Sequence, residues 1–522
     1  MNRNEVRQMW IKPIFAFFMM CFLLGCGVEK TPMQIQSSAS NPGGKKVILI
    51  MVDSLLKEPL ETLMKENKVP AFSFLKENGW YTDKMISSFP TMSVNIDSTL
   101  LTGTYADKHR VPGLRWYDVH SQRMINYGDG PLPILKTGVN HVLTDSLFRL
   151  NNEHLSKSEQ TIHEDLAKKG YSSSSINALV YRGTTEQTLH IPGPFQNIKT
   201  MAPPYFVLGT FHHYLTTNLK EQYLNYYGIN DHLSIQHLKQ LLHSQTLPHF
   251  TQVYLPDLDH ETHKHGRNLA ESVLKVDRRL QEIFNSYRSW NEAIQQNVFI
   301  VMGDSGVSKM KEEREEALIH LDHYFNAMKM AKPGEKPGPA VELALAVNER
   351  MAYVYPLQDR IQENELAEKL TSDSRMDTIS WKNGDWIEVV QGGSQKRLRF
   401  RPGSSYVDPY FQRWDIEGDV GVLDLQMGQQ RDRIMYGQYP DGLRHLYSAA
   451  HSHSGRFITV TAKPGYELKS GDSPTHVGGG AHGSFHEIDT YFPLFIAGTE
   501  KKPKTSRIVD FKSFILDVIG GE

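Results

Sequence analysis

Three apolar runs, far apart in the chain, each lead into an aspartate. KKVILIMVDS reaches Asp53, HFTQVYLPDLDH reaches Asp259, and NVFIVMGDSG reaches Asp304. The first run is unbroken, a pattern typical of a strand that is buried on both faces of a parallel sheet, and the other two resemble it. In such sheets ligands bind beyond the carboxyl ends of the strands. We therefore expect these three aspartates to lie together in space.

Helical patterns lie between these runs, for example NLAESVLKVDRRLQEIFNSY. The alternation of strands and helices predicts an α/β fold, with a mostly parallel central sheet flanked by helices, over residues 46–520. The segment TISWKNGDWIEVVQGGSQKRLRFRPGS differs, because Asn-Gly and Gly-Gly turns join alternating strands there. It predicts a smaller inserted α+β subdomain at about 340–460.

The N-terminus has the composition of an export signal. The apolar run PIFAFFMMCFLLG is preceded by three basic residues, Arg3, Arg7 and Lys12, and is followed by Cys26. This pattern predicts a lipoprotein signal peptide at residues 1–25, cleaved so that Cys26 carries lipid, and an uncleaved anchor helix is the alternative. Residues 26–45 are predicted to form a flexible tether. We expect an exported protein, anchored by lipid to the cell membrane outside the cytoplasm.

Charge and cysteine content narrow the functional classes further. Removing residues 1–25 takes away three basic residues and one acidic residue, so the net charge changes from −2 to −4. The sequence contains no basic stripe that would indicate nucleic-acid binding. The other cysteine, Cys21, leaves with the signal peptide, so no internal disulfide is expected. Stability must then come from the core or from bound metal.

The stretch YLPDLDHETHKHG concentrates potential metal ligands. Asp259 and His263 are four residues apart, so they project from the same side of one helical turn and suit a single ion. The alternative is a solvated, histidine-rich loop. His482 follows a glycine-rich loop and precedes the apolar run YFPLFIAG, which would return it to the same edge of the sheet.

A hydroxyl residue is placed before a helix-like run in SSFPTMSVNIDSTLLTG. Thr91 follows Pro90, and its side chain is expected near a helix N-terminus, where backbone N–H groups face an incoming anion. A simple N-cap is the alternative role, and Ser93 is the second hydroxyl nearby.

Taken in order, these motifs resemble the nucleotide pyrophosphatase/phosphodiesterase branch of the alkaline phosphatase superfamily, over about residues 46–500. The family spacing Y-x4-D-x3-H-x2-G is met by Tyr254, Asp259, His263 and Gly266. By this register Asp257, His260 and His265 are not ligands.

The resemblance implies two divalent metal ions and a covalent phosphoryl-enzyme route. One ion, zinc, would be held by Asp259, His263 and His482. The other would be held by Asp53, Asp304 and the oxygen of Thr91. Thr91 would attack phosphorus, and Asn95 would donate to a phosphoryl oxygen. The expected substrate is a small phosphoric ester, and a phosphodiester or nucleotide pyrophosphate is favoured over a monoester.

Two positions depart from the family pattern. DSLL stands where the family has D-G-x-R, and GDSG places Ser305 where the family has a metal-binding histidine. With oxygen ligands alone, the second site favours a harder ion such as manganese or magnesium, although zinc remains an alternative. His320 or His323 is the alternative source of a nitrogen ligand for this site.

Other enzyme classes fit less well. GDSG also occurs in trypsin-like proteases, but the α/β pattern is wrong for their β-barrels. A sulfatase would need a C/S-x-P-x-R motif, which FPTMSVNID lacks. Two alternatives stay open: a phosphomonoesterase of the same superfamily, and a non-catalytic, metal-stabilised surface-binding lipoprotein.

Overall fold

The computed structural model describes residues 44–191, 197–213, 225–267, 269–428, 432–471 and 473–521. The expected signal peptide, Cys26 and the expected tether as far as residue 43 lie outside these residues. Within the described part of the chain, no helix combines the length and the apolar character needed to cross a membrane.

A seven-stranded sheet is built around the first apolar run. In spatial order its strands are β2 (Gly79–Ile86), β24 (Tyr491–Ala497), β10 (Asn297–Met302), β1 (Lys46–Val52), β9 (Phe250–Leu255), β5 (Ser173–Ile176) and β8 (Tyr205–Val207). The three acid-terminated runs of the sequence are β1, β9 and β10, and β1 lies between the other two. Their carboxyl ends are therefore adjacent.

This first sheet is mixed rather than uniformly parallel. β1 pairs in parallel with β9 and β10, and β5 pairs in parallel with β9 and β8. β24, however, is antiparallel to both β10 and β2. The structure confirms the predicted α/β fold. The sheet, however, is mixed, whereas the sequence predicts a mostly parallel one. The reversal has a topological cause, because β24 enters the sheet from the loop that follows His482, at the end where β1 finishes.

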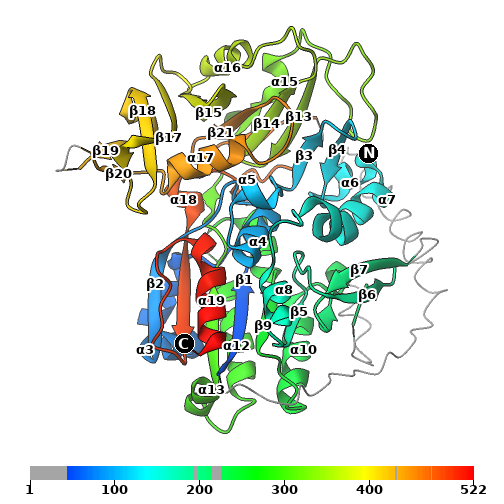
Figure 1. The fold of residues 1–522 in the computed structure, drawn as a ribbon, viewed down its shortest axis with the longest axis vertical. Helices are drawn as coiled ribbons and strands as arrows, with labels where there is room; N and C mark the ends of the chain where they lie inside the picture. The colour runs from blue at the N-terminus through cyan, green and yellow to red at the C-terminus, as the bar shows by residue number, and fades with distance from the viewer. Residues whose placement is uncertain are drawn as a thin grey trace, which may run out of the picture.

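Helices cover both faces of the first sheet (Figure 1). Alternate residues of β1 contribute to two separate cores, with Val47, Leu49 and Met51 in one and Ile48 and Ile50 in the other. This period of two is why the whole run must be apolar. One face is covered by α2 (Lys57–Lys65), α3 (Pro70–Glu77), α10 (Asp231–His243), α12 (Ala270–Phe284) and α13 (Trp290–Gln296).

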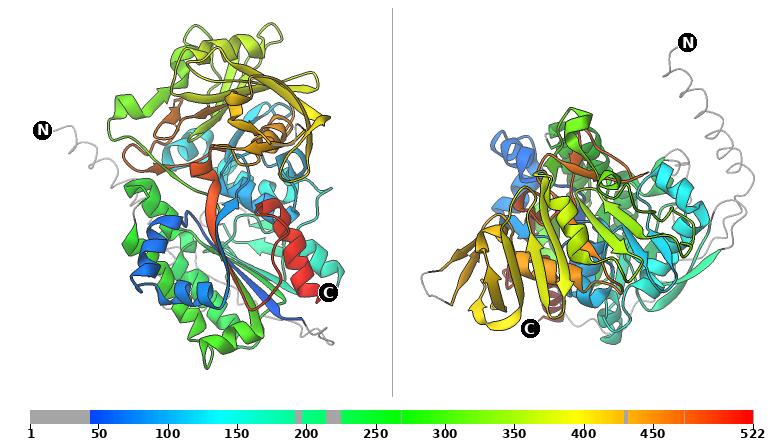
Figure 2. Two further views of the ribbon diagram at one scale, coloured as in Figure 1. Left: turned by 90° about the vertical axis from the view of Figure 1, so that its left-hand side faces the viewer. Right: turned by 90° about the horizontal axis from the view of Figure 1, so that it is seen from above.

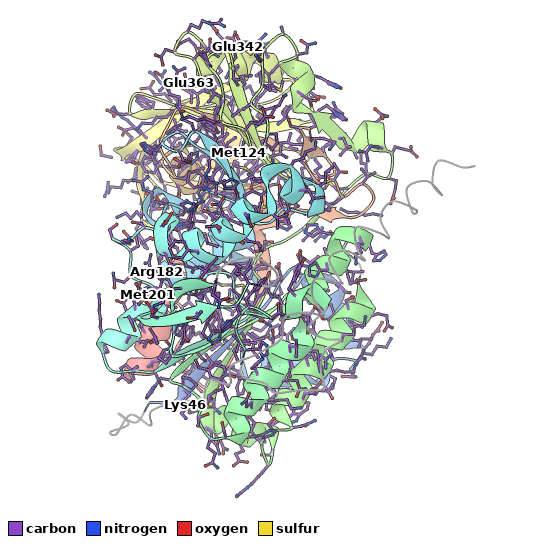
Figure 3. The ribbon with its side chains drawn as sticks, turned by 90° about the vertical axis from the view of Figure 1, so that its right-hand side faces the viewer. Lys46, Met124, Arg182, Met201, Glu342 and Glu363 are labelled. Carbon is purple, nitrogen blue, oxygen red and sulfur yellow. The ribbon has the colours of Figure 1, made fainter. Side chains whose placement is uncertain are left out.

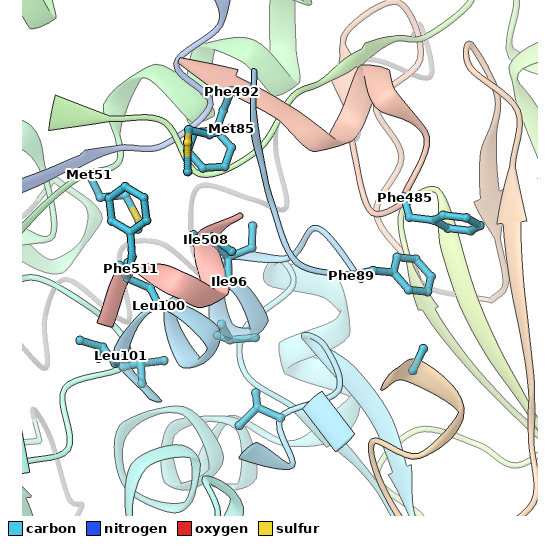
Figure 4. Close-up of a cluster of buried hydrophobic side chains, with 14 of the residues drawn as sticks. Met51, Met85, Phe89, Ile96, Leu100, Leu101, Phe485, Phe492, Ile508 and Phe511 are labelled. Atoms are coloured by element: carbon cyan, nitrogen blue, oxygen red, sulfur yellow. The ribbon is translucent and has the colours of Figure 1, made fainter. Parts of the chain in front are cut away.

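The opposite face is covered by α4 (Ser93–Thr102), α8 (Ile162–Lys168) and α19 (Phe511–Gly520). Figure 4 draws part of this core, in which Leu100 and Leu101 of α4 lie close to Phe511 of α19 and to Met51 of β1. Phe89, just before α4, packs against Phe485 with ring centroids 5.0 Å apart. These contacts fix the start of α4 at the carboxyl edge of the sheet.

A second seven-stranded sheet is antiparallel throughout. Its strands, in spatial order, are β13 (Leu343–Asn348), β14 (Met351–Pro356), β21 (Ile458–Ala462), β15 (Met376–Asn383), β16 (Trp386–Val390), β17 (Arg397–Val407) and β18 (Arg413–Gly418). The two-residue turn Gly384-Asp385 joins β15 to β16, and Gly384 has the positive φ of 60° that such a tight turn needs. Helices α16 (Glu363–Thr371) and α17 (Gly442–Ala450) pack against this sheet.

The two sheets occupy opposite halves of the molecule (Figures 1 and 2). Figure 3 places Lys46, where β1 begins, in one half, and Glu342, which precedes β13, at the far end of the other. β1 and β13 therefore both run toward the middle of the molecule. The residues that follow them, Asp53 and Glu349, meet there.

Shorter elements complete the described fold. The remaining strands are β3 (Arg115–Asp118), β4 (Arg123–Asn126), β6 (Thr185–Leu189), β7 (Ile198–Ala202), β11 (Ser308–Lys309), β12 (Leu318–His320), β19 (Leu425–Met427), β20 (Ile434–Tyr436), β22 (Glu467–Lys469) and β23 (Gly480–Ala481). The remaining helices are α5 (Ala106–His109), α6 (Pro131–Thr137), α7 (Val139–Thr144), α11 (Asp257–His265), α14 (Arg314–Ala317), α15 (Leu321–Tyr324), α18 (Glu487–Thr490), the π-helix η1 (Asp145–His154) and the 3-10 helices η2 (Asn225–Gly228), η3 (Val420–Leu423) and η4 (Ile508–Asp510).

Candidate active site

The three strand-terminal aspartates meet at one edge of the first sheet, as the sequence predicts. Ser54 joins two of them, because its N–H donates to Asp304 Oδ1 at 3.0 Å and its hydroxyl donates to Asp259 Oδ1 at 2.7 Å. Asp53 accepts a hydrogen bond from the hydroxyl of Tyr254, at the end of β9. Ser54 adopts a positive φ of 58°, which turns the chain sharply after β1 and brings its N–H and its hydroxyl to two different carboxylates.

Asp259, His263 and His482 form a group of potential metal ligands. One ligand atom from each residue lies within 4.8 Å of the others. His263 Nε2 is 3.3 Å from Asp259 Oδ1, and His482 Nε2 is 3.9 Å from the same oxygen. One carboxylate with two imidazoles is a donor set that suits zinc. The structure thus brings together the three residues expected to hold the first ion.

Both imidazoles of this group are oriented through their other nitrogen. His263 Nδ1 lies 2.9 Å from the carbonyl of Gly480, and His482 Nδ1 lies 2.5 Å from the carbonyl of Thr91. A carbonyl oxygen only accepts, so each Nδ1 carries a proton, and each Nε2 offers its lone pair once the ring is neutral. Metal-binding histidines are usually held in this way.

A short antiparallel ladder carries His482 to this position. Ser308 of β11 pairs with Ala481 of β23, which precedes His482, and Lys309 pairs with Gly480. The loop before β23 passes so close to α11 that a Cβ on Gly479 would lie 2.0 Å from the carbonyl oxygen of His263. The glycines of this loop are therefore needed for close approach of the two backbones.

Asp53 and Asp304 form a second, carboxylate-rich group. Within the described residues, neither Asp53 Oδ1 nor Asp304 Oδ2 has a hydrogen-bond partner, although both atoms are buried. The hydroxyl of Ser305 is also buried there without a described partner. Asp97, on α4, is 1% exposed, and neither of its carboxylate oxygens has a partner among the described residues. Buried carboxylates without donors are costly unless they are protonated or bind a cation.

Proton affinities reflect this crowding. Burial, with the carboxylates of Asp304 and Asp259 nearby, raises the pKa of Asp53 well above its usual range. Burial likewise raises the pKa of Asp304. At Asp259 burial opposes ionisation, but His263 and then His482 hold the pKa below its usual range. Burial would lower the pKa of His263, but Asp259 and Glu349 raise it well above the ordinary value. Cations at these positions would therefore displace protons.

The two candidate hydroxyls have different surroundings. The Thr91 hydroxyl is buried, donates to the carbonyl of Ser484 at 3.1 Å and accepts the N–H of Gly483 at 2.7 Å. The Ser93 hydroxyl is partly exposed and donates to Asp53 Oδ2 at 3.3 Å. Ser93 is also the first residue of α4, whose N-terminal N–H groups suit an anion. A turn in which Met92 N–H donates to the Pro90 carbonyl separates the two side chains.

Asn95 lies inside the protein rather than at the edge of the site. Its Nδ2 donates to the carbonyl of Val111 at 2.9 Å, and its Oδ1 accepts the hydroxyl of Ser88 at 2.7 Å. Asn95 is fully buried. Both ends of the amide are thus engaged in holding α4 against neighbouring loops, which leaves it poorly placed to meet a substrate oxygen.

Three further residues reach the site that the sequence did not single out. Glu349 Oε1 is 3.7 Å from His263 Nε2, and its Oε2 accepts the N–H of His482 at 2.9 Å. With His476, His263 and Glu349 form a second group whose ligand atoms lie within 4.8 Å of one another. Glu467 accepts a hydrogen bond from His476 Nδ1 at 2.8 Å. No local motif marks these residues, because they come from the second sheet and the loops beside it.

The other polar residues of the sequence motifs lie apart from both groups. His265 is exposed and lies near Glu261, with 3.7 Å between their charged atoms. His320 and His323 stack on each other, with ring centroids 4.8 Å apart. Neither of them, nor Asp257 or His260, belongs to a described group of three potential ligands.

Comparisons with known proteins give a consistent result. A family model described as type I phosphodiesterase/nucleotide pyrophosphatase matches residues 47–485. No curated protein sequence matches. Solved structures of murine and human ectonucleotide pyrophosphatase/phosphodiesterase 5 are similar in fold, each with a TM-score of 0.54, 13% identity, and coverage of 91% of this chain and 95% of theirs. An inactive threonine-to-alanine variant of the murine protein, in complex with AMP, has a TM-score of 0.55, with the same identity and coverage.

Proposed function

Because the chain belongs to the type I phosphodiesterase/nucleotide pyrophosphatase family, whose members are phosphoric ester hydrolases, we propose that it cleaves phosphoric diesters or nucleotide pyrophosphates with Ser93 as the attacking hydroxyl. The observation that carries the choice of nucleophile is the contrast between Ser93, which faces Asp53, and Thr91, whose hydroxyl is engaged in two buried hydrogen bonds. Thr91 remains the choice from sequence, and the experiment below separates the two.

The donor atoms fit a pair of divalent cations. Asp259, His263 and His482 would hold one ion, and this nitrogen-containing set favours zinc. Asp53 and Asp304 would hold the other with their unpartnered oxygens, together with Ser93 Oγ in place of the Thr91 oxygen. Ser305 leaves this second position without an imidazole, so manganese or magnesium would suit it as well as zinc. Cations in such a pair favour the ionised hydroxyl and offset charge that develops on the phosphoryl oxygens.

The residues of the chain then divide the remaining tasks. Ser93 Oγ attacks phosphorus and the bond from phosphorus to the leaving oxygen breaks, which leaves the rest of the substrate joined to Ser93 as a phosphodiester. Water later hydrolyses this serine phosphodiester, which releases the phosphate monoester and restores the hydroxyl. The N-terminal N–H groups of α4 face the incoming anion. Thr91 acts at a distance from the substrate, because its carbonyl orients His482 and its hydroxyl fixes the loop at Gly483. The backbone N–H groups at the start of α4 take the donor role that the sequence predicts for Asn95.

The similar structures support this proposal at the level of substrate class. The murine protein was captured with AMP after a single threonine was replaced by alanine, a replacement described as inactivating. In this chain a hydroxyl residue, Ser93, begins a helix and donates a hydrogen bond to Asp53. A nucleotide is therefore the first substrate type to test.

The test compares substitutions of the two hydroxyl residues, Ser93 and Thr91, in the purified, metal-loaded protein. With bis-(p-nitrophenyl) phosphate as substrate, Ser93→Ala should lose at least about 100-fold in kcat, because a covalent route needs its nucleophile. Thr91→Ser should keep most of the rate, since it retains the hydroxyl. Thr91→Val should destabilise folding by about 1–3 kcal/mol, because Gly483 N–H loses its acceptor.

Three outcomes distinguish Ser93 as the nucleophile, Thr91 as the nucleophile and a protein without catalytic activity. Ser93 that carries a p-nitrophenyl phosphoryl group, trapped at low pH and located by mass spectrometry, supports the proposal. A Ser93→Ala protein with the wild-type rate, beside a folded but inactive Thr91→Val protein, makes Thr91 the nucleophile. Wild-type protein that binds metal and nucleotide but turns over neither diester nor monoester is the non-catalytic binding protein.

A further inference from the structure

We propose that Glu349 and His476 are additional ligands of the ion held by Asp259, His263 and His482, so that the second sheet closes the first metal site. This inference rests on the metal binding of the proposed function. It concerns residues outside the motifs that identify the family, and its starting point is a five-residue cluster of acids and imidazoles from both halves of the molecule.

Two groups of three potential ligands, Asp259, His263, His482 and His263, Glu349, His476, overlap at His263. The Nδ1 of His263 is committed to the Gly480 carbonyl, so only its Nε2 is available to a metal. That one atom is 3.3 Å from an oxygen of Asp259 and 3.7 Å from an oxygen of Glu349. The two groups of three potential ligands share His263 and therefore cannot hold separate ions through it. One ion beside His263 Nε2 would have potential ligand atoms of both groups near it.

His476 is oriented in the same way as the other two imidazoles. Its Nδ1 and its backbone N–H both lie 2.8 Å from carboxylate oxygens of Glu467, which is fully buried. Its ring lies 4.3 Å, between centroids, from the ring of His263. A buried carboxylate that fixes Nδ1 and leaves Nε2 for a metal is a frequent outer partner of zinc-binding histidines.

Glu349 is held in place by the same loop that carries His482. It begins the two-residue turn between β13 and β14, with a positive φ of 56°. Arg350 N–H, in the same turn, donates to the carbonyl of His482 at 2.9 Å, while His482 N–H donates to Glu349 Oε2 at 2.9 Å. These reciprocal bonds leave Glu349 Oε1 facing His263. The turn is thus docked on the ligand loop, and its free oxygen points to the site.

Such a site would differ from an open catalytic zinc site. Three protein ligands leave a position on zinc open for substrate, and each further protein ligand leaves less room for it. With Glu349 and His476 present, the ion would tie the second sheet to the first, and substrate would have to displace a carboxylate to reach it. Glu349 is then both a ligand and a determinant of access.

The test measures metal binding directly. Isothermal titration of the full-length apo-protein with Zn²⁺ should give at least about tenfold weaker binding for Glu349→Gln and for His476→Ala. Glu342→Gln is the matched control, because Glu342 immediately precedes β13 and lies at the end of that strand away from Glu349 (Figure 3). Gln at 349 can still accept the His482 N–H, so the ligand loop should keep its place.

A spectroscopic measurement distinguishes a metal ligand from a residue that only stabilises the surrounding structure. In Co²⁺-loaded protein, Glu349→Gln should change the visible d–d absorption, which depends on coordination, whereas Glu342→Gln should leave it unchanged. Zn²⁺ affinity and Co²⁺ spectrum equal to wild type in Glu349→Gln would overturn this inference alone. Wild-type protein that binds no Zn²⁺ at all would instead overturn the metal site of the proposed function.

Discussion

At the scale of single residues, the site depends on which atom of each side chain is already engaged. His263 and His482 each use Nδ1 to reach a backbone carbonyl, which turns Nε2 toward Asp259. Thr91 uses its hydroxyl for the protein interior, whereas Ser93 directs its hydroxyl to Asp53. Residue type alone does not distinguish these roles. The roles differ according to which side-chain atom already makes a hydrogen bond.

The register of α11 leads to a prediction about neighbouring histidines. His263→Ala should lower Zn²⁺ affinity by at least about 100-fold, because a ligand is lost outright, whereas His265→Ala should leave it within about twofold. His265 is the matched control, being exposed on the same helix beside Glu261. Zinc content of the purified proteins, measured by mass spectrometry, checks the result. Equal zinc in the two variants would mean that α11 does not contribute His263 to the ion.

At the scale of elements, three short backbone contacts hold the site together. α11 approaches the loop before β23, the ladder between β11 and β23 carries His482, and the β13–β14 turn docks on His482. None of these contacts extends over more than a few residues, so small changes in backbone spacing should weaken metal binding.

Gly479→Ala tests this spacing. Its new Cβ would lie 2.0 Å from the His263 carbonyl oxygen, so α11 or the loop has to move. We expect at least about tenfold weaker Zn²⁺ binding without any change to a ligand. Gly338→Ala is the control, since nothing lies within 4 Å of its added Cβ. Titration with Zn²⁺ that gives the same affinity for both variants would contradict the role assigned to this close approach.

At the scale of the whole molecule, the two sheets meet at the ligand loops and share one hydrophobic cluster, and the protein contains buried carboxyl groups that respond to pH. Asp377, on β15 of the second sheet, is one of them. Burial raises its pKa from 3.8 to about 6, although the hydroxyl of Tyr439 donates to it at 2.7 Å. The folded protein therefore binds this proton more tightly than the unfolded chain does.

The pH dependence follows from that sign. The stabilisation by protonated Asp377 is complete below about pH 4 and is lost as the pH rises through 6, a change of about 3 kcal/mol. Asp377→Asn should thus become more stable relative to wild type between pH 4 and pH 7. Urea unfolding of both proteins at these two pH values measures it. A stability difference that is the same at both would contradict the assignment.

The N-terminal prediction also concerns the whole molecule. If lipid on Cys26 anchors the exported protein, Cys26→Ser should move it from the membrane fraction to the soluble fraction or leave the signal uncleaved. Stable attachment would need more than one acyl chain, because a single chain binds membranes only marginally. Fractionation with mass spectrometry of the mature N-terminus checks this. Unchanged membrane attachment of a cleaved Cys26→Ser protein would require a different anchor.

Local sequence determined much of the first sheet and half of the site. Apolar runs ending at Asp53, Asp259 and Asp304 specify buried strands, because every residue of such a strand needs an apolar neighbour on one face or the other. The i, i+4 spacing of Asp259 and His263 specifies their common side, because helix geometry is local. These features depend on neighbours in the chain, so the chain alone carries them.

Tertiary structure decided the rest. β24 runs antiparallel to β10, which its apolar run does not encode, because strand direction depends on how the chain enters the sheet. Thr91 and Ser93 are hydroxyl residues in one short segment, and only the packing of the Gly483 loop engages the first and leaves the second beside Asp53. Glu349 and His476 carry no motif and reach His263 from distant parts of the chain. Their proximity is fixed by long-range backbone contacts, whose partners no local pattern specifies.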